Sequence, residues 1–159
     1  MADVRSIFLP ACMLYPPKVG TWTLELATNV PGLLKAAAGE TAILHVPVPV
    51  AAVTEQFQGR KIASIEVFYT IATADCTSVA FALYDVTLSP HGTICSAAAV
   101  TTTVSVALAT AKLIGNNVEK VIITTPVILD GDSAYNLEAS FVCAAGTVLT
   151  IHGVRINLV

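Results

Sequence analysis

The sequence predicts an all-β fold, an antiparallel β-sandwich or jelly roll, and two observations carry this prediction. Apolar and polar residues alternate with a period of two through most of residues 60–159, and turn-forming residues separate the alternating runs at short intervals. Such alternation is typical of antiparallel strands that bury one face. Several short strands separated by turns are typical of a sandwich or jelly roll. At 159 residues, the chain suits one domain with a core of ordinary size.

Prolines set the N-terminal part of the chain apart from the rest. Residues 1–20 contain Pro10, Pro16 and Pro17, and we expect an extended N-terminal arm there. Such an arm either packs on a neighbouring subunit or remains a loosely ordered terminus. The single sandwich domain is then expected to span residues 21–159.

Two strands and one helical turn are expected before residue 60. Residues 21–26 and 41–46 alternate in the manner of strands. Pro47 and Pro49 must end the second of these strands or place it at a sheet edge. Residues 33–38 are expected to form one short helical turn.

Four alternating runs in the C-terminal hundred residues predict strands whose inward side chains form the core. Ala74 and Asp75 separate the first two runs. Ala145 and Gly146 make a short connection between the last two, which predicts a hairpin. His152 falls in the same phase as Val154 and is expected to share its face. The expected inward residues are Ile65, Val67, Tyr69, Ile71, Val79, Phe81, Leu83, Tyr135, Leu137, Ala139, Phe141, Cys143, Val154, Ile156 and Leu158.

The low charge content is the most informative feature of the composition. Only 12% of the residues are charged and 55% are hydrophobic, whereas a typical soluble domain is about 25% charged. A folded monomer of this mass exposes roughly 7,500 Å² of surface, which gives about one charged residue per 400 Å². An area of that size is close to that of the largest apolar patch on a typical monomer. We therefore expect other copies or a partner to cover much of the surface.

The charge distribution and the local sequence patterns argue against nucleic-acid and membrane partners, a signal peptide and a membrane span. The net charge is −3 and the charges are scattered, so we expect neither nucleic acid nor a membrane as a partner. The N-terminus lacks the pattern of a signal peptide, and residues 92–111 are too polar for a membrane span. The four cysteines have no metal-binding spacing, and buried thiols, which fit folding in a cytoplasm, are the expected state.

No motif in the sequence identifies catalytic, cofactor-binding or metal-ligating residues, and we expect none. Structural roles are predicted for His45, His91 and His152, because none has an acidic residue at a spacing that defines a site. Residues 130–132 (Asp-Gly-Asp) are interpreted as a turn, although calcium shared between adjacent subunits is an open alternative. Aromatic platforms for sugar binding are few: Trp22 is the single tryptophan, and Tyr69 and Tyr135 are expected in the core or an interface.

Residues 61–69 and 81–84, together with residues 132–139 and 151–158, resemble strands of the small jelly-roll structural proteins of tailed bacteriophages. The resemblance covers roughly residues 60–159 and is a pattern of strands, so it transfers no functional residue. It implies a virion protein, assembled in the host cytoplasm, that decorates a capsid or forms a fibre or tail module. It also implies a homotrimer in contact with the major capsid protein or other virion proteins.

Three functions are compatible with these features, in decreasing order of expectation. The first is a non-enzymatic capsid decoration, or cement, subunit that stabilises a particle through subunit and shell contacts. The second is a tail-fibre or receptor-binding module that recognises a glycan. The third is an enzyme, for which the sequence offers no converging acids, bases or metal ligands.

Overall fold

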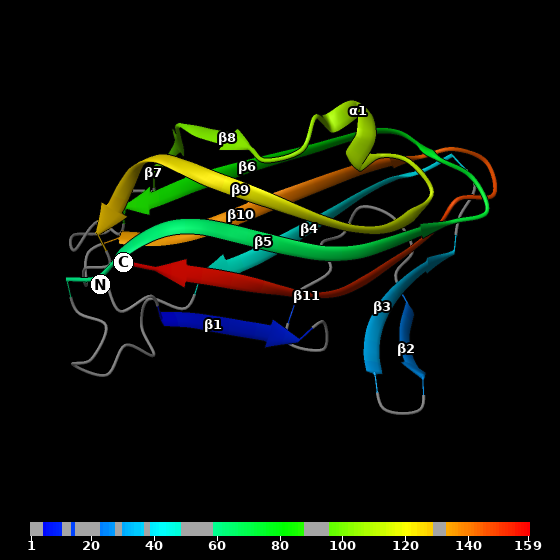
Figure 1. Ribbon diagram of the computed structural model, residues 1–159, viewed down its shortest axis with the longest axis horizontal. Helices are drawn as coiled ribbons and strands as arrows, with labels where there is room; N and C mark the ends of the chain where they lie inside the picture. The colour runs from blue at the N-terminus through cyan, green and yellow to red at the C-terminus, as the bar shows by residue number, and fades with distance from the viewer. Residues whose placement is uncertain are drawn as a thin grey trace.

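Two antiparallel sheets form a jelly-roll β-sandwich, which confirms the predicted fold class (Figure 1). The computed structural model describes residues 5–10, 14, 23–27, 30–36, 39–48, 59–87, 96–128 and 133–159. Within them, sheet A has the order β2-β3-β11-β5-β9-β8, with β1 also paired to β11, and sheet B has the order β4-β10-β6-β7. The elements are β1 (Arg5–Pro10), β2 (Thr23–Ala27), β3 (Val30–Ala36), β4 (Thr41–Val48), β5 (Lys61–Ala72), β6 (Cys76–Thr87), β7 (Ser96–Val100), β8 (Thr102–Val104), α1 (Leu108–Ala111), β9 (Gly115–Ile128), β10 (Ser133–Cys143) and β11 (Val148–Leu158).

The core lies between the sheets and is built from the inward phase of each strand. The inward residues predicted for β5, β6, β10 and β11 are buried, with two exceptions: Phe81 is partly buried and packs against the core, and His152 lies on the outer face. Phe141 of β10 lies with its ring centroid 5.1 Å from that of Tyr69 and 5.9 Å from that of Phe81. The contact between Phe141 and Tyr69 joins sheet B to sheet A, whereas the contact between Phe141 and Phe81 lies within sheet B. Each edge-to-face contact contributes about 0.5–1.5 kcal/mol beyond simple burial.

The connection through Ala145 and Gly146 is short, but the prediction that it forms a hairpin is wrong. β10 pairs with β4 and β6 in sheet B, whereas β11 pairs with β1, β3 and β5 in sheet A. The turn therefore carries the chain from one sheet to the other. Gly146 has φ 82°, a conformation that glycine adopts without a steric cost from Cβ. β5 and β6 also lie in different sheets, although they follow one another closely in the sequence.

The N-terminal strands correct one prediction and confirm two others. Residues 30–36 form β3, where a helical turn was expected from residue 33, because β3 pairs with β2 on one side and with the start of β11 on the other. Pairing with two neighbours outweighs a weak local preference. The strands predicted at residues 21–26 and 41–46 correspond to β2 and β4. β4 is an edge strand that includes Pro47, as proline requires.

β1 and β3 share one edge of β11, which brings residues 5–10 of the expected arm into sheet A. β1 runs antiparallel to residues 153–158 of β11, and β3 pairs with residues 148–151 (Figure 1). Leu14 is also buried in the core. The other residues of the expected arm lie outside the part of the chain that the structure describes.

Cys76 of β6 and Cys143 of β10 are buried partners on adjacent strands, as predicted for thiols in apolar surroundings. Cys12 and Cys95 lie outside the described residues. Within the described ranges, no helix has the length and apolar character needed to cross a membrane.

Candidate functional site

A cleft of about 440 Å³ lies on the outer face of sheet A, over β1, β5, β9 and β11. The outward position follows from the alternation of β5, in which Phe68 and Thr70 lie between buried residues. Pockets of roughly 300–1,000 Å³ are typical of small-molecule sites. The lining residues are Phe8, Phe68, Tyr69, Thr70, Asn116, Asn117, Val118, His152 and Arg155.

An aromatic corner forms one part of the cleft. The rings of Phe8 and Phe68 meet edge to face, with centroids 6.3 Å apart and an interplanar angle of 66°. Phe8 stands over Gly153 of β11, where an added Cβ would lie 2.7 Å from Cζ of Phe8 and 2.7 Å from the carbonyl oxygen of Leu9. The missing side chain at residue 153 therefore lets β1 bring Phe8 onto the sheet. Phe8 remains 55% exposed.

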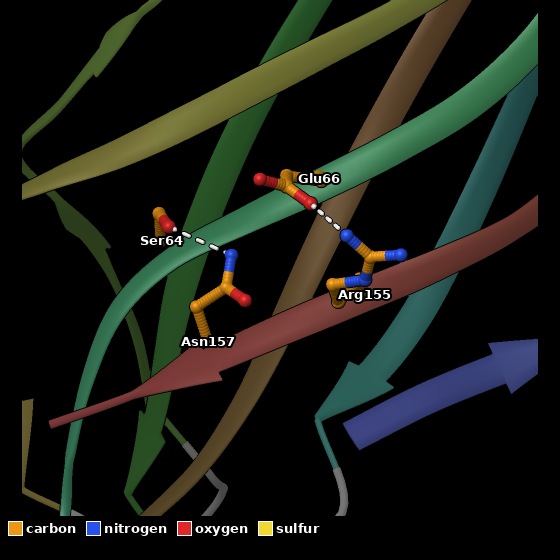
Figure 2. A network of polar contacts seen from close by, with 4 residues as sticks. All are labelled: Ser64, Glu66, Arg155 and Asn157. Carbon is orange, nitrogen blue, oxygen red and sulfur yellow. Dashed lines mark hydrogen bonds and ion pairs between the residues drawn. The ribbon is translucent and has the colours of Figure 1, made fainter. Parts of the chain in front are cut away.

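Arg155 supplies a positive charge beside this corner. Its Cζ lies 5.2 Å from the ring centroid of Phe68, within the range of a cation–π contact. Its Nη1 donates to Oε2 of Glu66 at 3.3 Å, on the neighbouring strand (Figure 2). On the next row, Nδ2 of Asn157 donates to Oγ of Ser64 at 3.1 Å. The two pairs cross from β11 to β5 on the outer face and hold both strands in register.

A polar row crosses three strands in the cleft. The hydroxyl of Thr70 donates to Oδ1 of Asn116 at 2.7 Å, and Oγ1 of Thr70 also lies 2.8 Å from Nε2 of His152. A threonine hydroxyl has one proton to donate, so the second contact must be donated by Nε2–H of His152. This arrangement places a proton on Nε2 of His152.

His152 faces outward, and the prediction that it shares a face with Val154 is wrong. The register pairs Ile151 and Gly153 with successive residues of β5, so His152 is an additional residue in β11. An extra residue of this kind is a β-bulge, which redirects the side chains around it. The bulge turns His152 into the cleft and gives Gly153 its position under Phe8.

Hydrogen bonds fix the loop before β9, which leads into Asn116 and Asn117 of the cleft lining. Nδ2 of Asn117 donates to the carbonyl oxygens of Leu113 and Gly115, each at 3.1 Å. Oδ1 of Asp75 accepts from the backbone N–H of Ile114 at 2.7 Å. The start of β9, which carries Asn116, is therefore held in a defined position.

Two polar groups lie beneath the cleft, on the core side of sheet A. The hydroxyl of Tyr69 donates to the carbonyl oxygen of Ala111 at 2.6 Å. Burial raises the pKa of Tyr69, and the nearby Glu119 carboxylate raises it further. Glu119 is fully buried, and its Oε1 accepts from the backbone N–H of Val106 at 3.1 Å. Both groups support the sheet from the core side.

The other residues considered from the sequence lie elsewhere. His45 is on the outer face of sheet B, where its Nδ1 lies 2.8 Å from Nδ2 of Asn136. Tyr135 is buried, as expected, and its hydroxyl donates to the carbonyl oxygen of Ile128 at 3.3 Å. Within the described residues, no cluster of three or more His, Cys, Asp or Glu residues could hold a metal. Trp22, His91 and residues 130–132 lie outside the described residues.

Few of the residues that line the cleft could be singled out from the sequence. Phe68 carried a usable signal, because an aromatic residue in the outward phase, between Glu66 and Thr70, indicates a contact surface. Phe8 carried none, since its position depends on a glycine at the opposite end of the chain.

Comparisons with known proteins identify no family. No protein-family model matches the chain, and no curated protein matches it. Similar solved structures include a xylan-binding module, CBM86, from the gut symbiont Roseburia intestinalis, with 10% identity and a TM-score of 0.39 over 99% of this chain and 97% of that one. A carbohydrate-binding module of the β-sandwich superfamily has 12% identity and a TM-score of 0.44, and the match covers 100% of this chain and 58% of that chain. A family two carbohydrate esterase from Cellvibrio japonicus has 7% identity and a TM-score of 0.43, and the match covers 99% of this chain and 34% of that chain. The present chain therefore spans about a third of the length of the esterase. Similarity at this level supports no inference about function.

Proposed function

We propose that this protein is a non-enzymatic glycan-binding module and that the cleft on sheet A holds the sugar. The observation that carries the proposal is the exposed ring of Phe8 beside the polar row of Thr70, Asn116 and His152. A sugar presents apolar C–H faces and hydroxyl edges. The electron-rich face of an aromatic ring suits the former, and amide, imidazole and hydroxyl groups suit the latter.

The lining favours binding over hydrolysis. Most glycoside hydrolases use two carboxyl groups placed on either side of the scissile bond. No aspartate or glutamate is among the described residues that line the cleft, and the carboxylate of Glu66, outside the lining, is engaged by Arg155. The cleft therefore has groups that orient a sugar, whereas the pair of acids needed to cleave it is not part of this lining.

Preorganisation also supports a binding role. The Thr70 hydroxyl fixes the rotamers of Asn116 and His152, and Asn117 fixes the loop before β9. Groups held in place before the ligand arrives lose little conformational freedom on binding, and this raises affinity.

A glycan array followed by calorimetry on the best ligand tests the proposal. Phe8→Ala should weaken binding by at least about tenfold, as expected for a central aromatic contact, whereas Phe8→Tyr keeps the ring and should retain most of the affinity. Ile128→Ala removes a comparably exposed apolar side chain of β9 outside the cleft lining and should leave binding unchanged. Failure of every glycan to bind, or normal binding by folded Phe8→Ala protein, would contradict the proposal.

An assembly subunit, including the capsid decoration protein and homotrimer expected from the sequence, is the second candidate. The observation in its favour is β7, an edge strand of sheet B in which Ala97, Ala98 and Ala99 are exposed without a charged neighbour in the strand. Edge strands of monomers usually carry charges or prolines that prevent strand pairing. Light scattering on a sizing column separates the candidates: a stable trimer that an Ala98→Lys variant dissociates favours assembly, and a monomer contradicts it.

A further inference from the structure

We propose that the sugar bound in this cleft is anionic and that Arg155 binds its negatively charged group, a carboxylate or a sulfate ester. The inference rests on the proposed glycan-binding function and names the class of sugar for the same cleft. It is carried by three features of the site: the charge of the lining, the position of the guanidinium, and the N–H donors that the guanidinium itself carries.

The charge of the lining is unbalanced in favour of an anion. Arg155 is the single Lys or Arg among the described residues that line the cleft, and these residues include no Asp or Glu. Glu66 lies outside the lining with an 18% exposed side chain. On its other side Glu66 is opposite Lys120 in the register of β5 and β9. The row that borders the cleft therefore has two cations and one carboxylate.

The contact with Glu66 holds the guanidinium of Arg155 in place and leaves N–H donors of the same group for a ligand. One nitrogen, Nη1, makes that contact at 3.3 Å, which is long for a charge-assisted hydrogen bond, since these are typically about 2.7–2.9 Å. The group carries five N–H donors in a planar fork, and the side chain is 46% exposed. The cation–π contact with Phe68 at 5.2 Å holds the guanidinium at the cleft, where its planar fork can donate two hydrogen bonds to one carboxylate or sulfate group.

The sugar would make three kinds of contact in the cleft. Phe8 would receive the apolar face of the sugar ring, Asn116 and His152 would meet its hydroxyl groups, and Arg155 would meet the acidic substituent. A neutral sugar would satisfy the first two contacts and would offer the guanidinium hydroxyl acceptors but no opposite charge. The cleft therefore predicts a preference for acidic over neutral sugars of the same skeleton.

Matched pairs of sugars test this preference by calorimetry. Trigalacturonate is compared with its fully methyl-esterified form, and a sulfated galactan oligosaccharide with its desulfated form. The acidic member of at least one pair should bind about tenfold more tightly than its neutral partner, the size of one good charge-assisted contact. The pair that shows the preference identifies the anion as carboxylate or sulfate.

Variants assign the preference to Arg155. Arg155→Gln should abolish the difference between acidic and neutral sugars while it retains the binding of the neutral form. Glu66→Gln should strengthen binding of the acidic sugar, because the guanidinium loses its competing carboxylate. Lys120→Gln removes a cation from the same face outside the cleft lining and should lower the preference far less than Arg155→Gln does. Thermal unfolding of each variant verifies that it is folded.

The outcomes separate the inference from the function on which it rests. Equal binding of acidic and neutral sugars, or a preference that survives in folded Arg155→Gln protein, would overturn the inference and leave the glycan-binding proposal intact. Binding of no sugar in either pair or on the array would overturn both. Binding of acidic sugars that depends equally on Arg155 and Lys120 would show general attraction to the face and would also overturn the assignment to Arg155.

Discussion

The ring of Phe8 occupies the space above Gly153 that a side chain would otherwise fill. A Cβ built on Gly153 lies 2.7 Å from Cζ of Phe8 and 2.7 Å from the carbonyl oxygen of Leu9, which is far inside van der Waals contact. Gly153 also has φ 156°, at the border of the region that side-chain-bearing residues avoid. The first strand of the chain, the last strand and the aromatic corner of the cleft therefore depend on one glycine.

Gly153→Ala is expected to displace β1 and to weaken ligand binding. The methyl group cannot be accommodated by rotation of Phe8 alone, because the carbonyl oxygen of Leu9 is backbone in the ladder with β11. Overpacking of this kind costs about 1–3 kcal/mol, so the free energy of unfolding should fall by that amount. Hydrogen exchange should show loss of protection in residues 5–10 before the rest of sheet A.

Gly146→Ala is the matched control for this prediction. Gly146 has positive φ, but nothing lies within 4 Å of a Cβ built there. Its substitution should cost about 1–2 kcal/mol from backbone strain without changing the exchange of β1 or the affinity of the cleft. If Gly153→Ala and Gly146→Ala affect β1 equally, the close approach of Phe8 does not determine the position of this strand.

The alternation of apolar residues was sufficient to predict the class of fold and the inward face of β5, β6 and β10. It could not predict which consecutive strands pair, because the alternation is the same when a turn stays within a sheet and when it crosses the sandwich, as at Gly146. It also failed at His152, because the bulge there inserts one extra residue and breaks the period of two. His152 therefore faces outward, although the pattern places it in the inward phase with Val154. The cleft was beyond reach for a similar reason: Phe8 and Phe68 are far apart in sequence and meet only after β1 pairs with β11.

Thr70→Val is expected to impair binding with little effect on folding. Valine has nearly the same shape but lacks the hydroxyl that joins Asn116 to His152, so both side chains lose their fixed orientation. Affinity for the sugar should fall by about two- to twelvefold, equivalent to one hydrogen bond of about 0.5–1.5 kcal/mol. Thr150→Val, the residue opposite Thr70 on β11 and outside the cleft lining, should bind normally. Equal losses in the two variants would exclude a specific role for the Thr70 hydroxyl.

Glu119 is expected to stabilise the loop before α1 through its acceptor oxygen. Oε1 accepts from the backbone N–H of Val106 at 3.1 Å and from Oγ of Ser105 at 3.3 Å, and the residue is fully buried. Glu119→Gln keeps a carbonyl oxygen at this position, whereas Glu119→Ala leaves the partly buried N–H of Val106 without its acceptor. Because an unsatisfied donor that is fully buried costs about 1–3 kcal/mol, urea unfolding should show the alanine variant to be less stable than the glutamine variant by about 1 kcal/mol, the lower end of that range. Equal stability of the two would show that another group satisfies Val106.

The phenol of Tyr69 is expected to make stability depend on alkaline pH. Burial, and then the Glu119 carboxylate, raise the pKa of Tyr69 in the folded protein, whereas a tyrosine in an unfolded chain titrates near about 10. The stabilisation from the protonated phenol is therefore fully present below about pH 10. It is lost as the pH rises further, because the unfolded chain releases its proton first.

Tyr69→Phe removes both this titration and the hydrogen bond to the carbonyl oxygen of Ala111. The variant should be less stable than the wild type by about 1–2 kcal/mol at neutral pH, and the difference in the free energy of unfolding should shrink as the pH rises above about 10. Urea unfolding at a series of pH values measures that difference. Phe141→Leu is the control, because it loses a ring contact with Tyr69 but retains the titrating phenol, so its deficit should remain nearly constant with pH. A constant deficit for Tyr69→Phe as well would mean that the phenol ionises equally in the folded and unfolded chains.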